Sequence, residues 1–243
     1  MCFNGHRSKR LILKMKYSKN IETVTSKYEK NVAYSLSDAV DLVQGLKYSR
    51  FDESVDLAIN LDVDPRHAEE NIRLTTPLPH GTGKIVSVLV LTSGPKEKEA
   101  LDAGADFVGN KEFLLKIKNG WTDIDKIVAT PDMMGELGKL GKILGPKGLM
   151  PNPKSGTVTM NVGKAVSDLK AGQVELRVES TGIVHVSCGK VSFTAAQLVD
   201  NIKVIYETIT KARPSSVKGQ YFKKMTISST MGPGIVVDHN SIG

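Results

Sequence analysis

The sequence predicts a two-domain protein of mixed α/β and α+β class, in which a discontinuous α+β domain carries an inserted Rossmann-like α/β domain. Strands near both ends of the chain alternate apolar and polar residues, as strands of an antiparallel sheet with one buried face do. Strands in the middle are almost continuously apolar and alternate with helices of about ten residues, which indicates a small parallel sheet covered on both faces.

The first regular elements are expected between residues 35 and 63. Ser35 or Ser37 can cap a short helix that runs to about Lys47. The stretch FDESVDLAINLDVD then alternates strictly and predicts a strand with one buried face. Because one strand does not form a stable sheet with so few neighbours, its partners must come from elsewhere in the chain.

The middle of the chain predicts the α/β pattern. Apolar strands are expected at residues 84–92, 105–109 and 125–132, and helices at residues 94–104, 111–120 and 133–144. The Gly- and Pro-rich stretch GPKGLMPNPKSG, residues 145–156, follows the last helix. It predicts a rigid basic loop, since its three prolines supply no amide donors.

Alternating strands return after residue 156. We expect a helix at 161–172, strands at 173–179 and 182–189, a long amphipathic helix at 194–212 and a strand from 221 that ends in the loop STMGPG. We therefore assign residues 15–74 and 158–243 to the discontinuous domain and residues 75–157 to the inserted domain.

Two Gly- and Pro-rich crossings would join these domains, and paired linkers of that kind are where a hinge is expected. The predicted hinge residues are Thr75, Thr76, Gly156 and Thr157. Residues 1–14 form a basic leader, interpreted as a basic arm or as an untranslated stretch upstream of a start at Met15.

Composition limits the classes of function. The formal net charge of +7 suggests a polyanionic partner, but eight Lys and Arg against two Asp and Glu fall within residues 1–31, so a basic tail alone would give the same total. The two cysteines and five scattered histidines predict no disulfide framework, no metal site and a reducing, cytoplasmic compartment. No apolar run is long enough to span a membrane, so no membrane partner is expected.

A nucleotide-binding enzyme built on the inserted domain is the main alternative. Every Gly-Lys pair fails the P-loop pattern, and no complete G-x-G-x-x-G occurs, so no cofactor is predicted. Asp132 is the best catalytic candidate because it follows a strand end, but we interpret it as the N-cap of the helix that begins at Met133. No nucleophile with a base is visible.

The discontinuous domain offers a surface suited to folded RNA. KYSRFDES supplies cations, Phe51 and Ser54. SSTMGPG supplies hydroxyls, Met231 and Gly232, a glycine that exposes backbone amides. Hydroxyls and backbone amides can reach ribose and base edges, and apolar faces stack on unpaired bases. The residues alone do not decide between this interpretation and a core-closing Phe51 beside an ordinary turn.

RFDESVDLAINL, LPHGTGK, LGPKGLMPNPKSGTVT and STMGPG, in this order, closely resemble the family of bacterial large-subunit ribosomal proteins that form the mobile stalk beside the tRNA exit site. The resemblance runs from about Met15 to about Asp238. It implies a non-catalytic ribosomal protein that binds the large-subunit rRNA of the stalk, assists the movement and release of exit-site tRNA, and represses translation of its own operon mRNA.

The resemblance also implies a two-domain split in which the discontinuous domain is the main RNA binder. With the residue-based reading, it gives the expected RNA-binding residues Arg50, Phe51, Ser54, Lys170, Ser228, Thr230, Met231 and Gly232. Lys147 and Lys154 are expected as secondary contacts to RNA or tRNA. The protein is expected to be a monomer off the ribosome, and a general basic RNA chaperone remains a third hypothesis.

Overall fold

The computed structural model describes residues 19–29, 32–67, 70–93 and 96–242. The predicted leader and the alternative start at Met15 lie outside these ranges. The helices are α1 (Lys19–Thr25), α2 (Leu36–Gly45), α3 (Lys96–Asp102), α4 (Lys111–Lys118), α5 (Met134–Lys139), α6 (Gly141–Leu144), α7 (Val162–Lys170) and α8 (Ala195–Lys211), with 3-10 turns η1 (Pro131–Met133), η2 (Pro153–Ser155) and η3 (His239–Ser241). The strands are β1 (Ser54–Leu61), β2 (Arg73–Pro77), β3 (Val88–Leu91), β4 (Phe107–Gly109), β5 (Lys126–Ala129), β6 (Gln173–Arg177), β7 (Ile183–Lys190), β8 (Phe222–Ser229) and β9 (Ile235–Val237).

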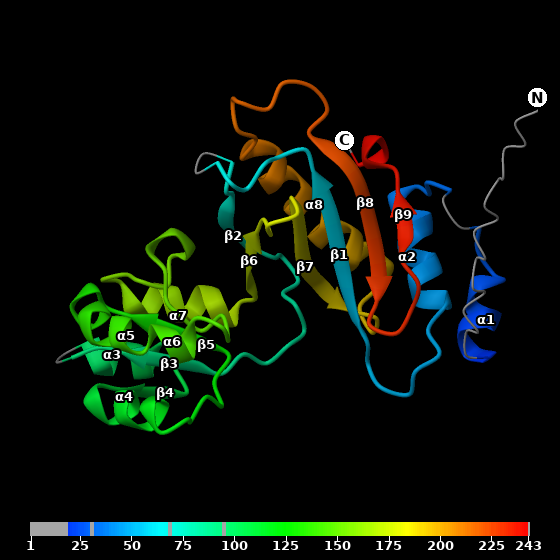
Figure 1. The fold of residues 1–243 in the computed structure, drawn as a ribbon. Coiled ribbons are helices and arrows are strands. Elements are labelled where there is room, and N and C mark those ends of the chain that lie inside the picture. Colours follow the sequence, from blue (N-terminus) through cyan, green and yellow to red (C-terminus); the bar gives the residue numbers. More distant parts are fainter. Residues whose placement is uncertain (1–18, 30–31, 68–69, 94–95, 243) are drawn as a thin grey trace, which may run out of the picture.

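The largest sheet is antiparallel, with strand order β7-β1-β8-β9 (Figure 1). On β1, Leu57 lies opposite Val186 of β7 on one side and opposite Ile227 of β8 on the other. Burial alternates along β1, which confirms the predicted strand with one buried face. The partners that this strand needs come from the C-terminal segment, so residues more than a hundred positions apart share one core.

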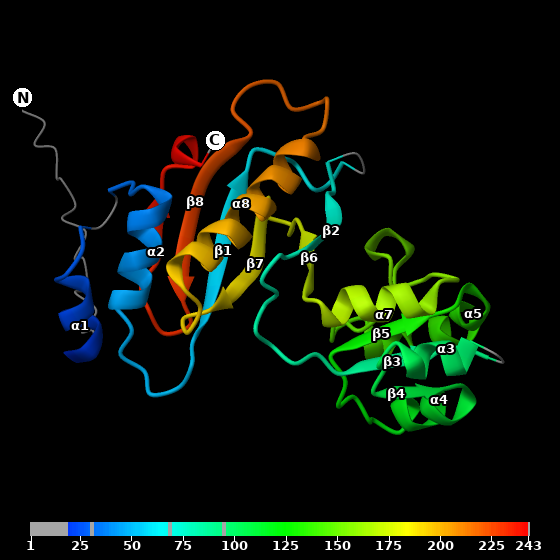
Figure 2. The same ribbon diagram turned by 180° about the vertical axis from the view of Figure 1, so that it is seen from behind.

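Helices α8 and α2 cover one face of this sheet, and α8 lies in front of β1 and β7 in Figure 2. Helix α8 begins with a capping box, in which Thr194 and Gln197 satisfy each other's backbone amides. Ser35 caps α2 by accepting a hydrogen bond from the Asp38 amide, as predicted. None of the described helices crosses the opposite face, which is turned toward the viewer in Figure 1.

The middle of the chain forms a parallel sheet of order β4-β3-β5, in which Leu91 pairs with Gly109 and Ala129. Alternate strand residues enter two hydrophobic clusters, one beneath α4, α5 and α6 and one beneath α3 and α7. Because both faces are covered, these strands are apolar throughout. The predicted fold class, an antiparallel sheet with helices plus a separate α/β part, is confirmed.

Strands β2 and β6 connect the two parts and pair with each other, from Arg73 opposite Arg177 to Pro77 opposite Gln173. Among the predicted hinge residues, Thr75 and Thr76 lie within β2. Gly156 and Thr157 lie instead beside the parallel sheet, where the Ala129 amide donates to the Thr157 carbonyl over 2.9 Å. Which residues turn in a domain movement stays a prediction.

Helix α7 shows where the core of the α/β part ends. It falls in the segment assigned from sequence to the discontinuous domain, yet Val162, Val166 and Leu169 pack against the parallel sheet. This packing favours a second boundary near residue 170 rather than 157, and the domain limits stay a prediction.

Three local elements differ from expectation. The single helix expected at residues 133–144 is replaced by the end of η1 followed by α5 and α6. The break falls at Leu140 (φ −94°, ψ 4°), between Gly138 and Gly141, because glycine weakens a helix interior. Strand β9 forms after the loop STMGPG, and β2 forms in a segment interpreted as a linker.

Candidate nucleic-acid interface

Two loops from distant parts of the sequence meet at one end of the antiparallel sheet, the lower end in Figure 1. One leads into β1 and the other leaves β8, and the pairing of Val55 with Ser229 brings them together. The Ser54 amide donates to Thr230 Oγ1 over 3.0 Å, and the Thr230 amide donates to the Ser54 carbonyl over 3.1 Å. The loops are therefore tied by reciprocal hydrogen bonds at the position where the strands end.

The Glu53 carboxylate is the second tie between the loops, and its side chain is fully buried. It accepts hydrogen bonds from Ser49 Oγ in its own loop and from the Met231 amide, the latter over 3.0 Å. Burial opposes ionisation and by itself raises the pKa of Glu53, but hydrogen bonds from Ser229, Ser49 and the Met231 amide outweigh it and leave this pKa below its ordinary value. A charged group thus holds the backbone of the STMGPG loop in place.

Two large apolar side chains stand exposed at this junction. Phe51 is 52% exposed and Met231 is 50% exposed, one from each loop. The Met231 backbone is further fixed by the Tyr48 hydroxyl, which donates to its carbonyl over 2.9 Å. The interpretation of Phe51 as a residue that only closes the core does not fit such exposure, since a core-closing ring would be covered.

Gly232 closes the loop through a contact that only glycine allows. Its amide donates to Ser229 Oγ over 3.1 Å, and a Cβ at this position would lie 2.4 Å from the same oxygen. Ser229 is itself buried and also bonds Glu53. The tight turn therefore depends on the same hydrogen-bond network as the Glu53 tie.

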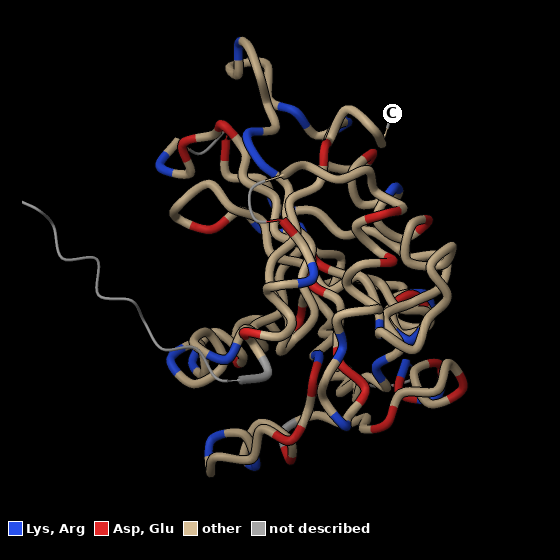
Figure 3. Tube along the Cα trace, turned by 90° about the vertical axis from the view of Figure 1, so that its right-hand side faces the viewer, with Lys and Arg blue, Asp and Glu red and all other residues tan. Residues whose placement is uncertain are grey.

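Cations surround the junction without forming a uniformly basic face. Arg50 and Lys47 are exposed, and Lys190 Nζ of β7 donates to Ser54 Oγ over 2.9 Å. Asp52 is also exposed and accepts from Ser192 Oγ over 2.8 Å. Figure 3 shows that basic and acidic residues are interspersed along the described chain, so long-range charge alone does not single out a binding face.

The structure brings together seven of the eight residues expected to bind RNA, which we call the loop surface: Arg50, Phe51, Ser54, Ser228, Thr230, Met231 and Gly232. Lys170 lies apart from them in α7, where its Nζ is 3.2 Å from an Asp106 carboxylate oxygen. Lys147 and Lys154 are exposed in the α/β part, and Lys147 donates to Thr122 Oγ1. The roles of all these residues stay predictions.

Sequence reasoning missed Glu53 and Lys190. Glu53 falls two residues before Val55, so the period of β1 places it on the buried face, and an acid at an inward position was the signal. Lys190 is found only from the pairing of β1 with β7, where it lies opposite Ser54. No local pattern in the sequence gives that register.

The model of the ribosomal protein L1p/L10e family matches residues 43–233, which include both loops and the entire α/β part. The chain belongs to this family. Members are structural constituents of the large ribosomal subunit that bind rRNA, and the family is not an enzyme family. The protein is accordingly part of the ribosome in the cytoplasm.

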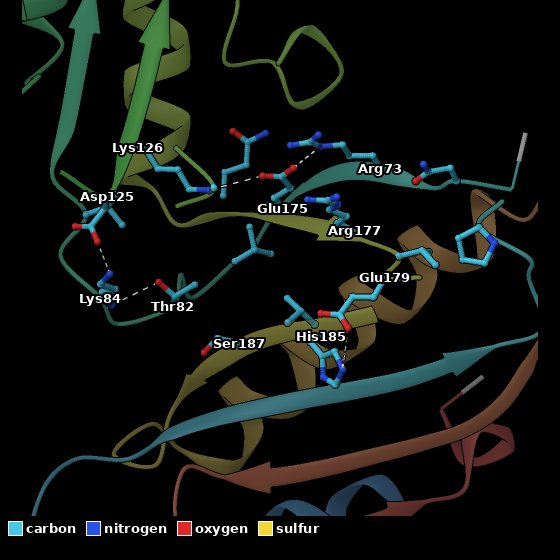
Figure 4. A pocket seen from close by; sticks show the side chains of 18 of the residues that line it. Arg73, Thr82, Lys84, Asp125, Lys126, Glu175, Arg177, Glu179, His185 and Ser187 are labelled. Atoms are coloured by element: carbon cyan, nitrogen blue, oxygen red, sulfur yellow. Dashed lines mark hydrogen bonds and ion pairs between the residues drawn. The ribbon is translucent and has the colours of Figure 1, made fainter. Parts of the chain in front are cut away.

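In this ribosomal protein a charged cleft of about 880 Å³ lies between the two parts of the chain (Figure 4). Glu175 of β6 binds Arg73 of β2 and lies 3.8 Å from Lys126 Nζ at the start of β5. Lys84 binds Asp125, whose pKa is lowered by that hydrogen bond and by those from Ser87. Because most of the charges in the cleft neutralise one another, we interpret it as a contact between the two parts rather than as an anion site.

The alternative centred on Asp132 has little structural support. Asp132 lies exposed within the turn η1, whose N-cap is Thr130, so the expected capping role was wrong. The described residues contain no group of His, Cys, Asp or Glu side chains that could hold a metal ion. In the same part of the chain, no helix is both long enough and apolar enough to cross a membrane.

Proposed function

We propose that the loop surface is the contact through which this ribosomal protein binds the rRNA of the mobile stalk. From the ribosome the protein would assist the movement and release of exit-site tRNA, and off the ribosome, as a monomer, it would repress translation of its own mRNA. The observation that carries the proposal is the junction of two loops, tied by Glu53 and Thr230, that exposes Phe51 and Met231 beside hydroxyls and cations.

The chemistry of this junction fits RNA better than it fits a small ligand. Exposed Phe51 and Met231 offer flat or polarisable faces to unpaired bases, and the Thr230 hydroxyl and nearby backbone groups can bond 2′-hydroxyls. Arg50 and Lys47 can neutralise phosphates at the rim of the same surface. Because the loops are held by buried hydrogen bonds, little ordering is required on binding.

The α/β part would supply the contact to exit-site tRNA through Lys147 and Lys154. Both side chains are exposed, and both lie in the stretch GPKGLMPNPKSG, residues 145–156, which leads to Thr157 and Val158 beside β5. Lys170 is left out of the proposal, since its ammonium group forms an ion pair with Asp106. The hinge between the discontinuous and inserted domains would let this tRNA contact move while the loop surface stays bound.

The proposal for mRNA repression requires that the stalk rRNA and the mRNA cannot bind one protein molecule at the same time. If a single loop surface recognises both the stalk rRNA and an element of the mRNA that imitates it, the two RNAs must compete for one protein molecule. Adding stalk rRNA to the protein–mRNA complex should release the mRNA at a one-to-one ratio. A ternary complex in a native gel would contradict this part of the proposal.

The decisive experiment titrates a stalk rRNA fragment against the full chain and its Thr230→Val and Phe51→Ala variants at several salt concentrations. Each variant should bind about five- to a hundredfold more weakly, with the salt slope unchanged, because hydroxyl and stacking contacts release no counterions. Arg50→Ala should reduce the salt slope by roughly one. Thr210→Val and Leu101→Ala, exposed sites on α8 and α3, serve as matched controls.

Three outcomes would redirect the assignment. Unchanged affinity in both loop variants would mean that another surface binds the rRNA. Equal affinity for unrelated RNA would favour the general RNA chaperone. Saturable binding of a free nucleotide to the α/β part would favour the nucleotide-binding alternative.

A further inference from the structure

Three aromatic side chains gather at the outer edge of the parallel sheet. Phe107 belongs to β4, Phe113 to α4, and Trp121 follows α4. The ring centroids of Phe107 and Trp121 lie 5.3 Å apart in an edge-to-face arrangement, and those of Phe113 and Trp121 lie 5.7 Å apart. These are three of the seven phenylalanine and tryptophan residues in the whole sequence, so their clustering at one sheet edge calls for a reason.

The rings line a pocket of about 490 Å³, together with Lys116 and Asn119. All three rings are only partly buried, in contrast to the aliphatic residues of the cluster beneath them. The Phe113 ring is seated on the backbone of β4, since a Cβ on Gly109 would come within 2.5 Å of Phe113 Cδ2. The pocket thus has a packed floor and aromatic rings that are partly exposed.

Polar groups at the rim of the pocket give it a positive charge and groups that can form hydrogen bonds. Lys116 Nζ lies 4.6 Å from the centre of the Phe113 ring and is exposed. The exposed Asn119 amide offers both a donor and an acceptor. Lys147, which donates to Thr122 next to Trp121, adds a second cation nearby.

We propose that this aromatic pocket binds one unpaired RNA base. The base stacks against the aromatic rings, Asn119 bonds its edge, and Lys116 neutralises the adjacent phosphate. Flat π-faces bordered by lysines match a nucleotide, because stacking accepts any base and the cations attract the backbone. An aliphatic side chain of a protein partner would pack against the rings but would leave the lysines without an anionic partner.

This site is separate from the loop surface in both sequence and structure. It lies in the α/β part at the side where β4 and α4 are found, away from the antiparallel sheet (Figure 1). Strand β4 is the edge strand there, while the other edge of the sheet is bridged between Ala129 and Val158. The proposal does not depend on the function assigned to Phe51 and Thr230.

The sequence contains a single tryptophan, Trp121, so its fluorescence reports on this pocket alone. We expect single-stranded oligoadenylate to quench the emission of the full chain saturably. Phe113→Leu keeps an apolar side chain on the floor but removes a flat ring, and should weaken the binding about five- to a hundredfold. Lys116→Gln should weaken it about two- to fivefold. Lys139→Gln, an exposed lysine of α5, is the matched control and should bind as the unaltered protein does.

The same titration is repeated with Phe51→Ala and Thr230→Val, which should leave the quenching unchanged. Loss of quenching in these variants would place the base at the loop surface and overturn the proposal. Absence of saturable quenching, equal quenching by inorganic polyphosphate, or equal affinity in Phe113→Leu would also overturn it. Quenching by a leucine-rich peptide but not by RNA would assign the pocket to a protein partner instead.

Discussion

The amide of Met231 donates a hydrogen bond to the buried carboxylate of Glu53 over 3.0 Å, although the two residues are 178 positions apart in the sequence. The same carboxylate also accepts hydrogen bonds from Ser49 and Ser229. Few other side chains of this size offer acceptors for all three donors. The Glu53 side chain therefore fixes the shape of the loop surface although it is itself buried.

Replacing Glu53 tests this directly. Glu53→Gln leaves one acceptor oxygen for donors that the carboxylate shares between two, so at least one of the hydrogen bonds from Ser49, Ser229 and the Met231 amide is lost, which costs about 1 to 3 kcal/mol of folding free energy. The midpoint of denaturant unfolding and the rRNA affinity should both fall. Asp102→Asn, an exposed acid on α3, is the control and should change neither.

The pH dependence follows from the same carboxylate. Since the pKa of Glu53 is lower in the folded protein than its ordinary value of 4.5, its contribution to stability is present above that value and is lost as the pH falls through the folded-state pKa. The stability difference between the unaltered protein and Glu53→Gln should therefore shrink on acidification below about pH 4.5. A difference that stays constant from neutral to acid pH, in denaturant unfolding at each pH, would show that the carboxylate is not ionised in the native state.

The turn at Gly232 gives an independent test. Gly232→Ala places a Cβ where it meets Ser229 Oγ, so either this hydroxyl rotates and gives up its hydrogen bond with the Gly232 amide, or the turn opens. We expect weaker rRNA binding and lower stability. Combining Gly232→Ala with Ser229→Ala should cost less than the sum of the single changes, because the clash disappears with the hydroxyl. Additive effects in this double-mutant cycle would mean that the two residues do not act through this contact.

The cleft between the two parts of the chain should respond to salt. Glu175 lies between Arg73 and Lys126, so it joins the connecting strands to the start of β5. Glu175→Gln should loosen this link and shift the small-angle scattering profile toward a broader range of domain orientations. Raising the salt from about 0.05 M to about 0.5 M should do the same to the unaltered protein and little more to the variant. Glu207→Gln, which removes an ion pair within α8, is the control and should leave the profile unchanged.

Much of the architecture was predictable because its signals are local. The alternation on β1 and the continuous apolar runs of β3 and β5 depend on neighbouring residues, and they gave two sheets of the correct types. Strand β2 escaped because its segment ends in Pro77 and reads as a linker, and only its pairing with β6 makes it a strand. The breaks within residues 133–144 depend on the combined effect of three glycines. The spacing of apolar residues, from which one helix is predicted, carries no information on that effect.

The candidate site was predictable residue by residue but not as an arrangement. Phe51 and Met231 could be named from sequence, whereas the hydrogen bonds that hold them depend on the register of β1 against β8. Lys170 shows the opposite case. A cation looked suitable for RNA in the sequence, but folding places it beside Asp106.

The junction of Ser54 with Thr230 affects when the loop surface can form during synthesis of the protein. Strand β8 lies between β1 and β9 in the sheet. Strands β8 and β9 come late in the sequence, whereas β1 comes within the first 61 residues. While the protein is being made, the half of the surface that holds Phe51 leaves the synthesising ribosome long before the half that holds Met231. A growing or prematurely ended chain therefore has no assembled loop surface, so under the proposed function only complete molecules would compete for RNA.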